Sequence, residues 1–141
     1  MNIGLFFTPI SESFFEQHEN TLGGKVDAFT EVVPDWRSAD IVIFGVPEYR
    51  GAGEQNNDRN DLEKIRNALY RQKSNIGNLR ITDIGDLKEG IELEDTNLRL
   101  QETISSLIQE NCLPIILGGS HDLTYGQYLG YVALELSLIH I

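Results

Sequence analysis

Three short apolar runs, each ending at or beside a glycine, set the tightest limits on how this chain can fold. They lie at residues 40–47, 78–85 and 113–117. The first and third are continuously apolar and contain β-branched residues, a pattern typical of strands buried on both faces of a parallel sheet. The second mixes polar and apolar residues and predicts a strand nearer the edge of that sheet.

Helical patterns separate the predicted strands. Apolar residues recur at helical spacing within residues 60–70, 93–108 and 123–136. The alternation of strands and helices implies right-handed crossovers between parallel strands, with helices on both faces of the sheet. We therefore predict an α/β fold, namely a three-layer doubly wound parallel sheet. The side chains expected to face the core are Leu62, Ile65, Leu69, Leu93, Leu100, Ile104, Leu107, Ile108, Leu123, Tyr128, Val132 and Leu136.

Residues 1–38 do not follow this alternation. We expect them to form a lead-in of one short helix and loops, packed against a single domain made by residues 39–141. The chain stays apolar to residue 141, whereas a natural C-terminus usually becomes polar. We therefore expect the domain to be truncated after its third helix, which would expose one edge of the strand at residues 113–117.

The charge of the chain limits its partners. Its 141 residues carry 22 acidic and 11 basic side chains, a net charge of −11, which disfavours nucleic acid and anionic membranes as partners. A single cysteine, Cys112, excludes an internal disulfide. Neither a membrane span of ~20 apolar residues nor a signal peptide is evident, so we expect a cytoplasmic location. Basic residues between Arg59 and Lys73 predict a solvated helix face or, alternatively, an anion or partner site.

The loop at residues 118–122 is the best candidate for chemistry, because ligands of open α/β sheets bind at the carboxyl ends of strands. The Gly118 and Gly119 pair allows a sharp turn, which places His121 over the end of the preceding strand. A neutral imidazole there can bind manganese or zinc, and Ser120 and Asp122 can hydrogen-bond its other nitrogen or a bound water. Alternatively, Ser120 or Asp122 caps the following helix and His121 is a polar loop residue.

Other chemistry-bearing residues give weaker signals. Residues 45–54 contain glycines without the spacing of a phosphate-binding loop, which favours a structural loop over a nucleotide site. His18 lies in the acidic lead-in and His140 in the apolar tail, and we expect both to be incidental.

Residues 113–122, with the sequence Leu-Pro-Ile-Ile-Leu-Gly-Gly-Ser-His-Asp, resemble the first metal-binding motif of the ureohydrolase family, which includes arginase, agmatinase and formimidoylglutamase. Three other landmarks occur in the order found in that family. Residues 39–47 are similar to its first strand and Gly-x-Pro loop, residues 64–70 to its first helix, and residues 84–86 to its second strand end. Together the landmarks extend the resemblance from residue 39 to about residue 131.

The resemblance implies an arginase-like fold and hydrolysis of a guanidine, amidine or formimino C–N bond with two manganese ions. In this pattern His121 matches the histidine ligand that the family takes from this loop. The family's other ligands come from an Asp-x-His-x-Asp segment and a later Asp-x-Asp, and neither follows His121 here. One imidazole cannot hold two divalent ions, whose charge needs several carboxylates.

We therefore expect the chain to be the N-terminal part of a manganese-dependent ureohydrolase, inactive by itself. The resemblance also implies a small amidine or guanidine substrate and a homo-oligomeric full-length protein. Two alternatives stay open. One is a non-catalytic family member that acts as a binding or assembly module. The other is a small receiver-like or nucleotide-binding α/β domain, which would need acidic residues clustered at strand ends or a phosphate near residues 51–53.

Overall fold

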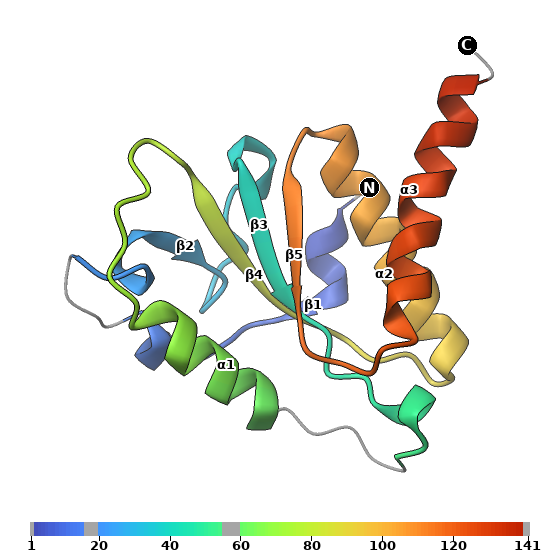
Figure 1. Cartoon of the computed structure of the whole chain (residues 1–141), viewed down its shortest axis with the longest axis horizontal. Helices are drawn as coiled ribbons and strands as arrows, with labels where there is room; N and C mark the ends of the chain where they lie inside the picture. Colours follow the sequence, from blue (N-terminus) through green and yellow to red (C-terminus); the bar gives the residue numbers. More distant parts are fainter. Residues whose placement is uncertain (1, 16–19, 55–59, 140–141) are drawn as a thin grey trace.

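The computed structural model describes residues 2–15, 20–54 and 60–139, and these residues build one sheet with helices on both sides (Figure 1). The strand order is β1-β4-β3-β5, and β2 also pairs with β4. The strands are β1 (Phe7–Thr8), β2 (Val26–Ala28), β3 (Ile41–Gly45), β4 (Ile81–Leu87) and β5 (Leu113–Leu117). The helices are α1 (Asn60–Tyr70), α2 (Leu93–Gln109) and α3 (Leu123–Ile139), with 3-10 turns at Ile3–Phe6, Glu12–Phe14, Gly23–Lys25, Trp36–Ser38 and Arg50–Ala52.

The three strands predicted from the sequence are confirmed as β3, β4 and β5. The predicted position of β4 near the edge of the sheet is wrong, since all seven of its residues are buried and it pairs on both sides. The polar side chains of β4 include Asp83 and Asp86, which are hydrogen-bonded to Arg66 inside the fold. Polar residues in this strand therefore did not mean that the strand is exposed. The strand at the edge is β5, which pairs only with β3 among the described residues and leaves Leu113 and Ile115 exposed.

The description of residues 1–38 as one short helix and loops is wrong. Within the described residues they contribute two strands and four 3-10 turns. Strand β1 pairs with β4 antiparallel, with Phe7 opposite Leu87, and β2 pairs with β4 in parallel, with Val26 opposite Ile81. Strands of two and three residues are too short to show a periodicity, and the antiparallel β1 makes the predicted parallel sheet a mixed one.

Two apolar cores, one on each face of the sheet, hold the helices. Side chains of β3 alternate between these faces, because successive residues of a strand point in opposite directions. Ile43 packs with α1, while Val42 and Phe44 pack on the side of α2 and α3 (Figure 1). This arrangement confirms the predicted three layers. Within α2 the fully buried apolar side chains are Leu100, Ile104 and Leu107, and burying each contributes roughly 1.5–3 kcal/mol.

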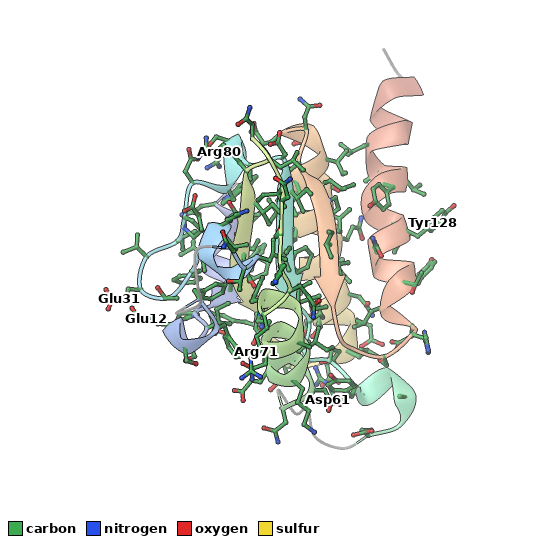
Figure 2. All side chains as sticks on the ribbon, turned by 60° about the vertical axis from the view of Figure 1, so that its left-hand side comes forward. Glu12, Glu31, Asp61, Arg71, Arg80 and Tyr128 are labelled. Carbon is green, nitrogen blue, oxygen red and sulfur yellow. The ribbon has the colours of Figure 1, made fainter. Side chains whose placement is uncertain are left out.

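Two helices depart in part from the predicted inward faces. In α1, Leu62 is buried as predicted, but Ile65 is 39% exposed, and Arg66 and Tyr70 are buried as well. In α3, Tyr128 is 58% exposed and points away from the sheet (Figure 2). Ile65 and Tyr128 were predicted to face the core because they are hydrophobic. In the structure, the ion pair of Arg66 and the packing of α3 against α2 determine which side of each helix is buried.

Glycine, rather than an aromatic residue, brings α3 against α2. Gly126 and Gly130 are both buried at this contact. A Cβ on Gly130 would lie 2.6 Å from Cβ of Ile104, a distance that real Cβ atoms essentially never show. The carbonyl of Gly130 also accepts a 3.0 Å hydrogen bond from Oγ of Ser105. The α2–α3 contact therefore depends on the absence of a side chain at residue 130.

A buried ion pair attaches α1 to β4. The Arg66 guanidinium is 1% exposed and donates to both Asp83 oxygens, at 3.0 and 3.2 Å, and to Asp86 Oδ1 at 2.6 Å. The Tyr70 hydroxyl donates to Asp83 Oδ2 at 2.5 Å. Burial lowers the pKa of Arg66, but the two carboxylates raise it by more, so its pKa lies above the ordinary value. Burial raises the pKa of Tyr70, and the Asp83 carboxylate raises it further.

Arg66 corrects one expectation from the basic segment. The sequence placed Arg66 with its basic neighbours on a solvated helix face, and the structure buries it between two aspartates. Elsewhere Cys112 is a free, buried thiol, as a single cysteine requires. No helix of the described residues has both the length and the apolar composition needed to cross a membrane.

We predict that Gly130→Ala destabilises the chain by about 1–3 kcal/mol, because the added methyl overpacks the α2–α3 contact and outweighs the better helix propensity of alanine. Urea unfolding followed by circular dichroism measures the change. Gly126→Ala is the matched control, since its nearest neighbour is the end of the Asn97 side chain, which can move. Equal stability of Gly130→Ala and the unmodified chain would contradict the packing described here.

We predict that Tyr70→Phe costs roughly 1.5–3 kcal/mol at neutral pH, because it removes a buried hydrogen bond to a carboxylate. The pKa of Tyr70 is raised in the folded chain, so its contribution is complete below the unfolded pKa of ~10 and declines as the pH rises above it. The cost of Tyr70→Phe should therefore shrink in alkaline urea titrations. Tyr125→Phe, at an exposed tyrosine, is the matched control and should leave the stability at neutral pH unchanged.

Candidate functional site

The loops that leave β3 and β5 meet at the carboxyl edge of the sheet. The two strands are adjacent and parallel, and the Val46 amide donates to the Leu117 carbonyl at 2.9 Å just beyond them. The chain passes from β3 to α1 on one face and from β5 to α3 on the other. Ligands of open α/β sheets bind where neighbouring strands diverge in this way.

The glycine pair after β5 makes the sharp turn that the sequence predicted. Gly118 and Gly119 have φ of +76° and +83°, a left-handed conformation that other residues rarely adopt. A Cβ on Gly119 would lie 2.1 Å from Cδ1 of Leu123 and 2.8 Å from the carbonyl oxygen of Val46. The turn therefore needs glycine both for its conformation and for the close approach to the neighbouring loop.

His121 follows this turn and lines a pocket of about 330 Å³. It is exposed, and its carbonyl accepts a 3.1 Å hydrogen bond from the Thr124 amide at the start of α3. The ring is therefore accessible from a hollow at the carboxyl edge and is not part of the apolar core. The other residues that line the pocket are Ile116, Gly118, Gly119, Ser120, Leu123, Thr124 and Gln127.

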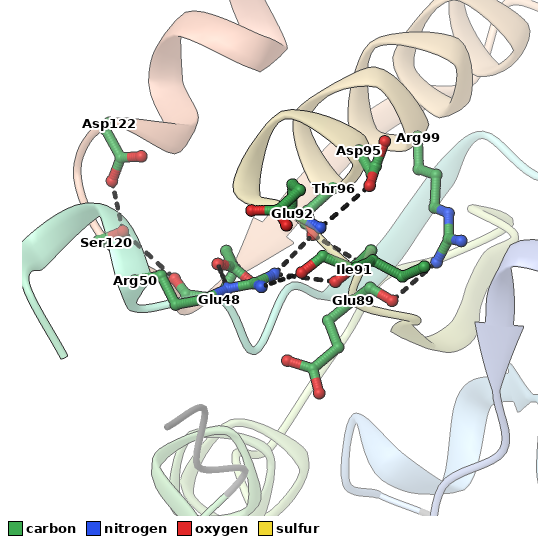
Figure 3. Close-up of polar contacts among 11 residues, drawn as sticks. Glu48, Arg50, Glu89, Ile91, Glu92, Asp95, Thr96, Arg99, Ser120 and Asp122 are labelled. Carbon is green, nitrogen blue, oxygen red and sulfur yellow. Dashed lines mark hydrogen bonds and ion pairs between the residues drawn. The ribbon is translucent and has the colours of Figure 1, made fainter. Parts of the chain in front are cut away.

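Ser120 and Asp122, predicted to support the imidazole, have other partners. Oγ of Ser120 is hydrogen-bonded to the Asp122 carboxylate and, at 3.2 Å, to the Glu48 carbonyl (Figure 3). The Asp122 carboxylate also lies against Gly51, where an added Cβ would be 2.1 Å from Oδ2. These side chains thus connect the loop after β5 to the loop after β3. Within the described part of the chain, neither is hydrogen-bonded to His121.

The buried pair of Glu48 and Arg50 was missed by the sequence analysis. Glu48 is 0% exposed, and Arg50 donates to its two carboxylate oxygens at 2.7 and 3.0 Å (Figure 3). The hydrogen bonds to Glu48 raise the pKa of Arg50 above its ordinary value. An acidic and a basic residue two positions apart in a glycine-bearing loop is the only sequence signal, and it is too common to be informative.

Arg50 also connects this pair to the start of α2. Its guanidinium donates to the carbonyls of Ile91, at 2.7 Å, and Gly90, at 3.0 Å. The Gly90 amide in turn donates to Oγ1 of Thr96 at 2.8 Å. The helix itself begins with a capping box in which Glu92 and Asp95 exchange side-chain and backbone hydrogen bonds. Arg50 therefore joins the loop after β3 to the segment between β4 and α2.

The described residues do not make a complete metal site. Among them there is no group of three or more His, Cys, Asp or Glu side chains that could hold a metal ion. A binuclear manganese centre needs several carboxylates, and His121 with the already paired Asp122 does not provide them. The predicted role of His121 as a metal ligand stays a prediction at this point.

The fold and its loops define an α/β domain with one imidazole at a strand-end pocket, and its family follows from its sequence. Residues 39–141 match the sequence model of the arginase family. That match covers most of the chain, so the chain belongs to the arginase family. Membership confirms the resemblance to ureohydrolases and replaces the receiver-like or nucleotide-binding alternative.

Curated relatives are similar to parts of the chain. A formimidoylglutamase from Geobacillus sp. is 41% identical over 49 residues, which are 34% of this chain and 15% of that protein. An agmatinase from Pyrococcus horikoshii is 32% identical over 100 residues, 64% of this chain and 35% of that protein. The guanidino acid hydrolase of human mitochondria is 35% identical over 95 residues, 61% of this chain and 27% of that protein. The chain thus spans well under half the length of these relatives.

Solved structures share the fold. The formiminoglutamase of Trypanosoma cruzi with Mn²⁺ superimposes with a TM-score of 0.59 at 22% identity, over 72% of this chain and 41% of that one. The agmatine ureohydrolase of Thermoplasma volcanium gives 0.58 at 23% identity, over 70% of this chain and 36% of that one. These likenesses confirm an arginase-like α/β fold of which this chain contains a part.

Proposed function

We propose that this chain is the N-terminal part of a manganese-dependent hydrolase of guanidine, amidine or formimino C–N bonds, and that His121 is one of its metal ligands. The observation that carries the proposal is the family match over residues 39–141, whose sequence includes the loop with His121. The structure adds that this loop lies at the carboxyl edge of β5 and that His121 lines a pocket there.

The chemistry of the relatives supports this reaction class. Three of them are named formimidoylglutamase, agmatinase and guanidino acid hydrolase, and one structural neighbour contains Mn²⁺. A divalent pair bound by such a protein would supply an activated water for attack on the carbon of the C–N bond. The substrate class is therefore a small cationic or polar molecule with a guanidine, amidine or formimino group.

We propose that further ligands come from polypeptide that follows His121 in the full-length protein. Residues 39–141 would then be one part of a single catalytic domain, with residues 1–38 as its lead-in. The described residues contain no group of three potential ligands, and two metal ions need several carboxylates, so the 141-residue chain should be inactive alone. A homo-oligomeric assembly and a cytoplasmic location complete the proposal.

A second candidate is a non-catalytic family member that serves as a binding or assembly module. The absence of a three-ligand cluster among the described residues is the observation that favours it. The two candidates differ in the coding sequence beyond codon 141. An Asp-x-His-x-Asp segment within the next few dozen codons supports the hydrolase, and an open reading frame without such aspartates supports the module.

We expect the purified 141-residue chain with added Mn²⁺ to hydrolyse neither arginine, agmatine nor formiminoglutamate above the rate without protein. Release of urea or formamide measures turnover. If the coding sequence continues, the longer polypeptide should hydrolyse one of these substrates, and His121→Asn in it should lower kcat/KM at least about 10-fold. Turnover by the 141-residue chain, or full activity of the His121→Asn variant, would show the assignment to be wrong.

A further inference from the structure

The main chain and the side chain of Glu48 contact different parts of the carboxyl edge. Its main-chain carbonyl accepts hydrogen bonds from the Ser120 amide at 2.9 Å and from Oγ of Ser120 at 3.2 Å. Its side-chain carboxylate accepts hydrogen bonds from Nε and Nη2 of Arg50 (Figure 3). Glu48, whose carbonyl accepts the hydrogen bonds from the loop after β5, is thus fixed through its side chain by an ion pair that does not contact that loop.

We propose that Glu48 and Arg50 are a positioning pair that fixes the loop of residues 118–122, and with it the His121 imidazole, at the carboxyl edge of the sheet. The proposal rests on the function proposed above, because it concerns the site to which His121 is assigned there. It adds a role for two residues in the loop after β3, to which neither the resemblance nor the sequence patterns gave a function.

Arginine is suited to this role because its planar guanidinium binds a carboxylate through two parallel hydrogen bonds. Here it also donates to the Ile91 and Gly90 carbonyls at the start of α2, so its position is fixed from two sides. The Arg50 side chain is only 26% exposed and that of Glu48 is 0% exposed. Removing the arginine would leave a carboxylate buried away from water, which is strongly unfavourable.

A carboxylate left without its arginine would move toward solvent and carry the Glu48 main chain with it. The Ser120 amide would then lose its acceptor, while the Val46 amide would keep its bond to Leu117 in the neighbouring strand. These two amides therefore report separately on the order of the loop and on the order of the sheet.

The test is native-state hydrogen exchange of the 141-residue chain, measured by NMR on the unmodified chain and on Arg50→Met. We expect protection of the Ser120 amide to fall at least about tenfold in Arg50→Met, with protection of the Val46 amide and the β3–β5 ladder changed much less. A general loss of stability would lower all of these values together, so the difference between them identifies positioning.

Arg99→Met is the matched control. Arg99 lies in α2 and, like Arg50, donates to main-chain carbonyls near the start of that helix, those of Lys88 at 2.8 Å and Glu89 at 2.9 Å. Within the described part of the chain Arg99 makes no hydrogen bond to Glu48, so this variant should leave Ser120 protection unchanged. Equal loss of Ser120 protection in Arg50→Met and Arg99→Met, or a parallel loss at Val46, would overturn the proposal.

A double variant keeps the test decisive if Arg50→Met alone fails to fold. Glu48→Gln with Arg50→Met removes both charges and avoids an unpaired buried carboxylate. It should restore global stability. Ser120 protection should stay below that of the unmodified chain, because residue 48 is then no longer fixed to the start of α2, and full recovery of that protection would contradict a positioning role for the ion pair. None of these measurements uses metal or substrate, so their outcome is separate from the success or failure of the proposed hydrolase function.

Discussion

The arrangement of the candidate site depends on one contact, the hydrogen bonds from Ser120 to the main-chain carbonyl of Glu48. Strands β3 and β5 pair in parallel up to Gly45 and Leu117, and then their chains must separate toward opposite faces of the sheet. The Glu48 carbonyl holds the two loops together after that separation. These hydrogen bonds, together with the close approach of Gly119 to the Val46 carbonyl, hold the glycine turn that precedes His121.

Two ion pairs with buried carboxylates each fasten a helix, one on each face of the sheet. Arg66 joins α1 to the aspartates of β4, and Arg50 joins the loop after β3 to the start of α2. Buried pairs contribute little net stability compared with apolar residues of the same shape, but losing one partner is costly. We therefore interpret them as devices that specify one arrangement of the carboxyl edge, while the apolar cores supply most of the stability.

The continuous apolar runs and the glycine pair could be interpreted from the sequence alone. Burial on both faces of a sheet and a left-handed turn each produce a local sequence pattern. Strands β3 and β5, all three helices and the turn before His121 followed from such patterns. The central position of β4 could not be predicted, because its neighbours β1 and β2 are too short to show the alternation of a strand in the sequence. Arg66 and the Glu48–Arg50 pair were missed for a related reason, since the sequence predicts a charged residue to be exposed until the contacts that bury it are known.

The central claim is that the imidazole of His121 binds a divalent metal ion at the carboxyl edge of the sheet. Paramagnetic broadening of histidine ring signals in the NMR spectrum of the longer polypeptide, which supplies the further ligands proposed above, tests it directly near neutral pH. Substoichiometric Mn²⁺ should broaden the His121 signals before those of His18 and His140, while diamagnetic Mg²⁺ should not broaden them. Equal broadening of all three histidines, or none at His121, would contradict the claim.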